Sequence, residues 1–218
     1  MAGLVKVFSH VRSGSSLMLH TLGQNFEFEG DLKTGAGPAG HWAGRTRVEG
    51  HPFGRLFGSH DFYRKGLRGV YIFRDGRDVA LSCWRTKAFL HPKDRSSLSL
   101  SDFLKKKLDW VATPAKKARG KKRTIFEHWR DHVASYHGKP GIVLVRFENL
   151  VLNPDRTINR VADALNLPRP NPPVPVKALV GRFPNDGLVS GWRKFFGYND
   201  LALFNKIVSR DFYGRFTE

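Results

Sequence analysis

Three short apolar runs, each followed by a polar turn and an amphipathic segment, constrain the fold of this chain more than any other feature. The runs are "LVKVF", "GVYIF" and "GIVLVRF", and the segments that follow them begin near residues 15, 75 and 153. Runs of this length fit buried strands, and the following segments carry apolar residues at helical spacing. Strands that alternate with helices predict an α/β fold, a three-layer domain with a central, mainly parallel sheet flanked by helices.

Capping residues and apolar spacing indicate where the helices begin. The expected caps or first residues are Ser15 or Ser16, Asp75 or Asp78, and Asn153 followed by Pro154. Further helices are expected near residues 101–112, 124–137 and 201–210. The glycine-rich stretch at residues 30–54 is expected to form a long loop, and loops of that length often carry function.

Length and composition predict a single domain that spans residues 1–218. Of the 218 residues 40% are apolar, which is enough to bury a core. No apolar run approaches the roughly 20 residues that a membrane-spanning helix needs, and no basic and apolar leader precedes the first run. The one cysteine, Cys83, lies in a segment with the pattern of a buried helix, so we expect a cytoplasmic protein.

The chain is strongly basic. Its formal net charge is +18, which favours nucleic acid, an anionic membrane, an acidic glycan or a polyanionic cofactor as a partner but does not choose among them. Much of the excess lies in residues 105–123. A charge run of this kind is either a solvated surface or a site that attracts an acidic acceptor.

The first polar turn, "SHVRSGSSLML" at residues 9–19, joins a strand to a helix through small residues. A helix N-terminus presents unpaired N–H groups and a partial positive charge, so it can hold a phosphate or sulfate. The residues of this anion cradle would be Arg12, Ser13, Gly14, Ser15 and Ser16. Because ligands bind beyond the carboxyl ends of parallel strands, this turn is expected beside those that follow Phe73 and Phe147.

Two motifs resemble the nucleotide-binding motifs of sulfotransferases that use 3′-phosphoadenosine 5′-phosphosulfate (PAPS). "VRSGSSLM" is similar to the 5′-phosphosulfate loop, which reads P-R-S-G-T-T-L-M in tyrosylprotein sulfotransferases, with Val11 in place of proline. "YIFRDGRDVALS" is similar to the 3′-phosphate motif, a strand followed by R-x-x-x-D-V-x-x-S, and it supplies Arg74 and Ser82. The kinase P-loop pattern is not met, because its second glycine and its lysine are missing.

Other fragments extend the resemblance over residues 4–196. "RFENLVLNP" is similar to Y-E-D-L-x-x-x-P with Phe147 in place of tyrosine, and "HWRDHV" is similar to a W-x-x-H-V helix. "GLVSGWRKFF" resembles G-x-x-G-D-W-K-x-x-F near the C-terminus. Asn185 and Asp186 stand where the family has Arg-Lys, which puts the C-terminal contribution to 3′-phosphate binding in doubt.

The resemblance implies a P-loop-like sulfotransferase fold and in-line transfer of a sulfuryl group from PAPS to a hydroxyl or amine, with adenosine 3′,5′-bisphosphate (PAP) as product. It implies that Ser13 to Ser16, Gly14 included, hold the 5′-phosphate, and that Arg74 and Ser82 hold the 3′-phosphate. Arg12 is expected to bind the phosphosulfate and to stabilise the departing phosphate as a permanently charged group. No metal is required by this scheme.

A hydroxyl acceptor needs a base, and the resemblance points to His60. The family's base is often a histidine shortly before the 3′-phosphate strand, and "FGSHDFYRKGLRGVYIF" places His60 there. His51 and a carboxylate such as Asp61 remain alternatives. The acceptor would be a small molecule, a glycan or a peptide, and its identity does not follow from the sequence.

Three other classes of protein stay open. A basic nucleic-acid-binding protein would explain the charge, although nucleic acid is not the partner that the motifs favour. A P-loop-type kinase would explain the first turn but not the spacing of Arg74 and Ser82, and it would need magnesium. An inactive sulfotransferase-like binding protein would account for Asn185 and Asp186.

Overall fold

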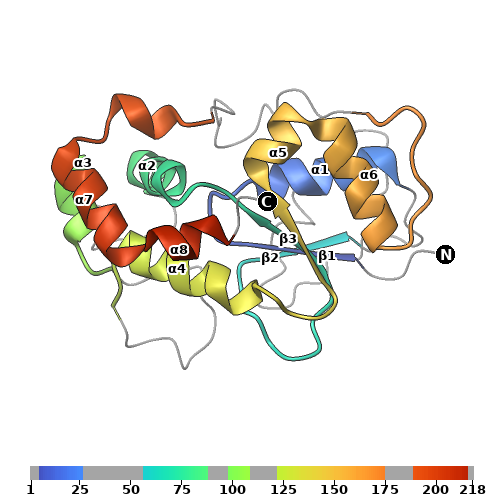
Figure 1. Cartoon of the computed structure of the whole chain (residues 1–218), viewed down its shortest axis with the longest axis horizontal. Helices are drawn as coiled ribbons and strands as arrows, with labels where there is room; N and C mark the ends of the chain where they lie inside the picture. The colour runs from blue at the N-terminus through green and yellow to red at the C-terminus, as the bar shows by residue number, and fades with distance from the viewer. Residues whose placement is uncertain (1–4, 27–55, 88–97, 109–121, 175–188, 216–218) are drawn as a thin grey trace.

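A parallel four-stranded sheet with the strand order β2-β1-β3-β4 forms the centre of the computed structural model (Figure 1). The model describes residues 5–26, 56–87, 98–108, 122–174 and 189–215. The strands are β1 (Val5–Ser9), β2 (Leu56–Ser59), β3 (Gly69–Phe73) and β4 (Ile142–Arg146). Because all three neighbouring pairs are parallel, the carboxyl ends of the four strands lie along one edge of the sheet.

Helices cover both faces of the sheet (Figure 1). One layer contains α1 (Ser15–Asn25), α5 (Phe147–Leu152) and α6 (Pro154–Ala164). The other contains α2 (Gly76–Thr86), α3 (Leu100–Lys105), α4 (Ile125–Tyr136), the 3-10 helix η2 (Gly191–Lys194), α7 (Tyr198–Ile207) and α8 (Arg210–Gly214). The predicted α/β fold, with a parallel sheet flanked by helices, is confirmed.

Alternation along the strands divides the core between the two faces of the sheet. Val7 and Ile72 pack with Met18 in the α1 layer, and all three side chains are fully buried. Phe8 and Tyr71, their neighbours in sequence, pack on the opposite face with residues of α2 and α4. Every residue of β3 is buried, as expected of a central strand covered on both faces.

The structure corrects the expected start of α1. Gly14 is the N-cap residue, with left-handed backbone angles (φ 99°, ψ 22°) and no side-chain capping bond, so the prediction that Ser15 or Ser16 caps this helix is wrong. Both serines instead form the first turn of α1. The second cap is Asp75, whose carboxylate accepts from the Arg77 N–H.

Other boundaries also differ from expectation. β2 was not predicted, because it is a short edge strand whose sequence "LFGS" contains glycine. The helix expected at residues 101–112 ends at Lys105, and Leu108 forms an antiparallel bridge with Arg123. Asn153 precedes α6 without a side-chain capping bond, and the last predicted helix is divided into α7 and α8. The long loop at residues 30–54 lies outside the described residues.

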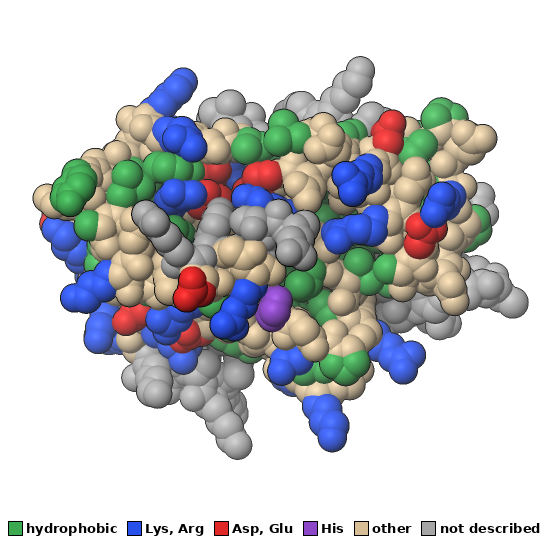
Figure 2. Space-filling view, viewed as in Figure 1, with side chains coloured by type: hydrophobic (Ala, Val, Ile, Leu, Met, Phe, Trp, Pro, Cys, Tyr) green, Lys and Arg blue, Asp and Glu red, His purple; other side chains and the backbone are tan. Residues whose placement is uncertain are grey.

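None of the helices in the described parts of the chain is long and apolar enough to cross a membrane. Figure 2 shows lysine and arginine side chains spread over much of the visible face, with few acidic ones between them. The central part of the basic segment at residues 105–123 lies outside the described residues, so its role stays a prediction.

Gly69 lies where the backbones of β1 and β3 approach one another closely. Its φ is +144°, and a Cβ there would overlap the backbone carbonyl of Lys6, whereas Gly66 (φ +86°) has open space at the same position. We expect Gly66→Ala to cost about 1 kcal/mol of folding free energy through backbone strain, and Gly69→Ala to cost at least twice as much. Denaturant unfolding of the two variants measures this difference, and equal losses would contradict the clash.

Candidate active site

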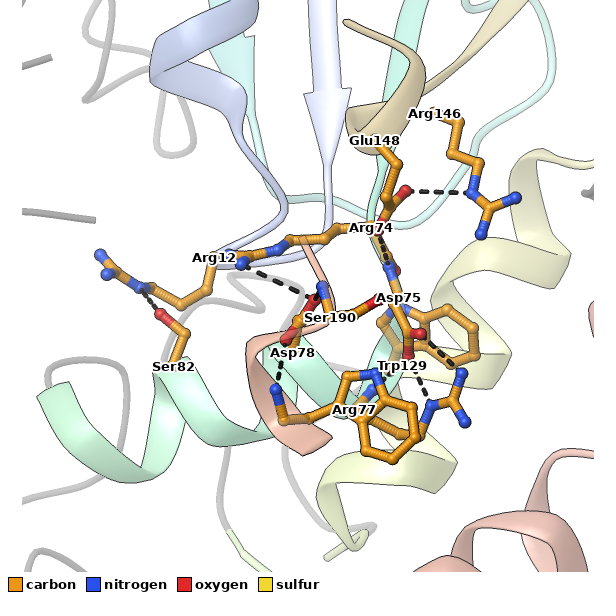
Figure 3. Close-up of polar contacts among 11 residues, drawn as sticks. Arg12, Arg74, Asp75, Arg77, Asp78, Ser82, Trp129, Arg146, Glu148 and Ser190 are labelled. Atoms are coloured by element: carbon orange, nitrogen blue, oxygen red, sulfur yellow. Dashed lines mark hydrogen bonds and ion pairs between the residues drawn. The ribbon is translucent and has the colours of Figure 1, made fainter. Parts of the chain in front are cut away.

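The turns that leave β1, β3 and β4 meet at the carboxyl edge of the sheet (Figure 3). Arg12, from the first turn, donates from Nε to Oγ of Ser82 on α2 at 2.8 Å. Glu148, at the start of α5, accepts through Oε1 from the backbone N–H of Asp75 at 2.9 Å. The parallel sheet therefore brings together three segments that the sequence analysis expected to share a ligand.

Gly14 allows the backbone of the first turn to lie close to the ring of Phe147. Its φ of +99° is strained for other residues, and a Cβ there would lie 2.5 Å from Cδ2 of Phe147. Arg12, two residues earlier, also has a positive φ of 65°. Ser13 is fully buried, and its Oγ has no hydrogen-bond partner among the described residues. Such a buried hydroxyl beside the N-terminus of α1 is suited to an anionic ligand.

Arg74 is held at the end of β3 with only 4% of its surface exposed. Its guanidinium lies 4.6 Å from the centroid of the Phe147 ring, and its Nη2 is 3.9 Å from Oδ2 of Asp78. Its backbone carbonyl accepts from Nε1 of Trp129 on α4 at 3.1 Å. The residue is thus held by contacts from three different elements, two to its side chain and one to its backbone.

Arg12 and Arg74 bring two positive charges into a largely buried site. Burial lowers the pKa of each guanidinium, and the repulsion between the two adds to the effect on Arg12. Both nevertheless stay charged, because an arginine pKa starts far above neutrality. Buried cations gain most from a ligand that carries opposite charge, so this arrangement favours an anion.

Asp78 connects the same region to the C-terminal part of the chain. Its two carboxylate oxygens accept from the backbone N–H groups of Ser190 and Trp192, each at 2.9 Å. Burial raises the pKa of Asp78, and the nearby Arg74 counteracts that shift. Asn185 and Asp186 lie outside the described residues, so their effect on a 3′-phosphate site is not addressed by these contacts.

Glu148 completes the connection between α5 and α2. Besides Asp75, it accepts through Oε2 from Nε of Arg146 at 3.0 Å, and it is almost fully buried. The sequence analysis quoted Glu148 in the "RFENL" fragment without giving it a role. Because the carboxylate is buried and accepts the Asp75 N–H, it holds the backbone of the Arg74–Asp75 turn in place.

His60 lies directly after β2, beside the end of β1. Its Nδ1 donates to the backbone carbonyl of Ser9 at 2.9 Å, which in the neutral ring leaves the lone pair on Nε2. The residue is 4% exposed. The carboxylate of Asp61 instead lies 3.8 Å from Arg64, whose side chain is exposed, and His51 lies outside the described residues.

Three further histidines surround this position, and the sequence analysis missed them. His10 donates from Nδ1 to the Val11 carbonyl and accepts through Nε2 from Nδ1 of His128, both at 2.8 Å. His132 donates from Nε2 to the His60 carbonyl at 3.1 Å. The i, i+4 spacing of His128 and His132 on α4 was the available signal, because it places both on one helix face.

Burial controls the charge of this histidine cluster, His10, His128 and His132. It lowers the pKa of His10 and His128 well below the ordinary value and lowers the pKa of His132 to about 3. The rings are therefore neutral near pH 7. No group of three or more His, Cys, Asp or Glu residues in the described ranges is arranged to hold a metal ion.

Comparison with known proteins identifies the family. The profile of the sulfotransferase domain matches residues 43–176, which is more than half of the chain. The chain therefore belongs to the sulfotransferase domain family, as the sequence motifs predicted. The first turn lies outside the matched range, so its resemblance to the 5′-phosphosulfate loop is additional to that match. No curated protein sequence matches the chain significantly.

Solved structures share the fold at low sequence identity. The mouse sulfotransferase SULT7A1 complexed with PAP aligns with a TM-score of 0.60 and 13% identity, covering 97% of this chain and 85% of that one. Retinol dehydratase complexed with retinol and PAP aligns with a TM-score of 0.56 and 14% identity, covering 98% and 81%. Its complex with androsterone and inactive cofactor PAP gives 0.57 and 14%, covering 98% and 80%.

The neutral histidine cluster predicts sensitivity to acid. The pKa of His132 is about 3 in the folded chain, and its ordinary value is 6.5. Between these two values the unfolded chain binds more protons than the folded chain, so the folded state becomes less stable as the pH is lowered. Through His132 alone, the free energy of unfolding should fall by about 2 kcal/mol from pH 7 to about pH 5. Thermal melting across this range should show a falling Tm with a shallower slope in His132→Asn. A Tm independent of pH would contradict burial of neutral rings.

Proposed function

We propose that this chain transfers a sulfuryl group from PAPS to a hydroxyl acceptor and releases PAP. The observation that carries the proposal is the meeting of the two phosphate motifs at one sheet edge, where Arg12 is hydrogen-bonded to Ser82 at 2.8 Å. Membership of the sulfotransferase domain family supports it. A buried guanidinium, that of Arg74, and a half-buried one, that of Arg12, suit a donor that carries a phosphate at each end.

On the donor side, the 5′-phosphosulfate would lie at the N-terminus of α1, against Ser13, Gly14, Ser15 and Ser16. The buried Ser13 hydroxyl and the N–H groups of the first helical turn would donate to its oxygens. The 3′-phosphate would lie against Arg74 and Ser82. Arg12 contacts both halves of this site, because its backbone belongs to the first turn and its Nε reaches Ser82.

On the acceptor side, His60 would act as the general base. Its tautomer presents the lone pair of Nε2, to which the acceptor hydroxyl would give its proton as the new bond from oxygen to sulfur forms. The bond between sulfur and the 5′-phosphate oxygen breaks in the same step, and the charge developing on that oxygen is stabilised by Arg12. The scheme requires no metal, because arginine supplies the positive charge.

The structural neighbours suggest an acceptor class to test first. The structural neighbours were solved with retinol and with androsterone, which are small molecules with a hydroxyl group. We propose a small-molecule hydroxyl acceptor for this chain, with glycans and peptides as the other classes to test. Transfer of label from PAPS to 2-naphthol, retinol, androsterone, a tyrosine peptide and a glucosamine glycan would distinguish them.

We also propose a cytoplasmic location. The chain has one cysteine, and Cys83 is buried in α2, so it forms no disulfide within the chain. Burial raises the pKa of Cys83 to about 12, which keeps the thiol unreactive. A fluorescent fusion that enters a secretory compartment would contradict this location.

The first functional prediction concerns recognition of the 3′-phosphate. PAP should raise the Tm well above the shift given by AMP, because AMP lacks the phosphate assigned to Arg74 and Ser82. Arg74→Ala should remove this difference and weaken PAP binding by tenfold or more, since charge-assisted hydrogen bonds contribute about 1.5–3 kcal/mol. Arg169→Ala, which removes the same charge from an exposed ion pair with Asp163, is the matched control.

Parallel melts with ATP plus magnesium and with an oligonucleotide test the other classes. A larger shift from ATP and magnesium than from PAP would indicate a kinase, and a shift from the oligonucleotide that disappears with salt would indicate nucleic-acid binding. Equal shifts from PAP and AMP would contradict the assignment of Arg74. PAP binding without sulfuryl transfer to any acceptor would indicate an inactive binding protein.

The second functional prediction separates the base from the donor site. His60→Ala should lower kcat by roughly two to four orders of magnitude with nearly unchanged PAP affinity, because a base acts on the acceptor. Arg12→Ala should weaken both turnover and PAP binding, since its charge meets the donor in the ground state as well as in the transition state. Steady-state kinetics and calorimetry measure these effects. Full turnover by His60→Ala would move the search to His51 and Asp61.

A further inference from the structure

One buried face of α4 points at the segment that carries the proposed base. Its residues His128, His132 and Tyr136 are four positions apart, so they lie above one another on the helix. All three are buried, with His132 and Tyr136 completely so. Polar side chains buried in a core need hydrogen-bond partners. The partners of these three side chains indicate the role of this face.

His132 forms one hydrogen bond with each of its ring nitrogens. Nε2 donates to the backbone carbonyl of His60 at 3.1 Å, and Nδ1 accepts from the hydroxyl of Tyr71 on β3 at 2.8 Å. Because a carbonyl only accepts, the first bond sets the tautomer of the ring, and the second is satisfied by that tautomer. The ring of His132 is thus fixed between the central strand and the His60 carbonyl.

The next residues of the His60 segment are attached to the same helix. The hydroxyl of Tyr136 donates to the Asp61 carbonyl at 2.6 Å, and the backbone N–H of Tyr63 donates to Oγ of Ser135 at 3.2 Å. The imidazole of His60 is attached separately, through Nδ1, to Ser9 at the end of β1. Its backbone and its ring are therefore held from two different elements.

We propose that His132 is a positioning residue for the reaction, which holds the His60 carbonyl so that Nε2 of His60 keeps a fixed direction. This inference rests on the proposed role of His60 as the base. A base is effective only within hydrogen-bond reach of the proton it takes, so a displacement of its backbone lowers turnover. The Nδ1 bond to Ser9 restrains the ring, but it holds its direction only while the His60 backbone stays in place.

Two amide substitutions separate the bond to His60 from the other contacts of His132. His132→Gln places an amide N–H near the position of Nε2, so it can still donate to the His60 carbonyl. His132→Asn places the same amide near Nδ1, where it can meet the Tyr71 hydroxyl but does not reach His60. Val133→Ala, at the next position of α4 and equally buried, controls for lost stability.

The direct test is the tautomer of His60 observed by NMR in protein labelled with ¹⁵N-histidine, with PAP added. In the parent, two-bond proton–nitrogen correlations should show a proton on Nδ1 of His60, with His60→Ala used to assign the signals. His132→Asn should shift both nitrogens toward an average of the two tautomers. His132→Gln and Val133→Ala should retain the parental pattern. A parental pattern in His132→Asn would overturn the proposal.

Kinetics provide the second test, with the acceptor that the parent sulfates fastest among the five compounds named above. His132→Asn should lower kcat by about 10- to 100-fold with the KM for PAPS unchanged, and His132→Gln should stay within about threefold of the parent. In the His60→Ala background, His132→Asn should cost less than about twofold, because it acts through His60. Equal losses in Asn and Gln variants, or additive losses in the double variant, would also overturn it.

These results distinguish the two proposals. If His60→Ala keeps full turnover while His132→Asn disturbs the His60 tautomer, His60 is held by His132 but is not the base. If His60→Ala loses turnover while His132→Asn changes neither the tautomer nor kcat, the base is correct and the positioning role is wrong.

Discussion

The site depends on the parallel pairing of β1 with β3 and of β3 with β4. In register, Ser9 lies opposite Ile72, and Phe73 lies opposite Arg146, so these strands end at the same edge of the sheet. The turn that follows each strand then places polar side chains at that edge. Residues 70 positions apart, such as Arg12 and Ser82, become hydrogen-bonded there. In an antiparallel sheet the carboxyl ends of neighbouring strands lie at opposite edges, so their turns would not form one site.

Two carboxylates at this edge, Asp78 and Glu148, divide their contacts between arginine side chains and backbone N–H groups. Asp78 lies 3.9 Å from Arg74, which is too long for a close ion pair, and its carboxylate oxygens also accept two backbone N–H bonds. Glu148 is shared in the same way between Arg146 and the Asp75 N–H. The carboxylates therefore hold the surrounding backbone as well as contacting the arginines. Arginines gathered at one edge of a sheet in this way attract an anionic ligand.

The sequence was sufficient where local chemistry determines the structure. The strand Gly69–Phe73 agrees with prediction because its apolar run is continuous, and Asp75 caps α2 because an aspartate there can accept from the helix. The convergence of the turns that follow β1 and β3 was predictable, since it follows from parallel topology. The contacts of His132 were not, because its partner is a backbone carbonyl 72 residues away that carries no sequence signal. Gly14 as the α1 cap was missed because a left-handed glycine and a capping serine occur in the same sequence pattern.

Backbone carbonyls fix the orientation of three buried histidines near the ends of β1 and β2. His10, His60 and His132 each donate from one ring nitrogen to a backbone carbonyl, so the direction of each of these protons is determined by the fold. Burial keeps His10 and His132 neutral, and they add no positive charge to that of the guanidiniums. On the proposal that His60 is the base, a charged imidazole at either position would repel the positive charge that His60 gains when it takes the acceptor proton. Neutral neighbours that are fixed in orientation can therefore hold the His60 segment in place without adding positive charge beside it.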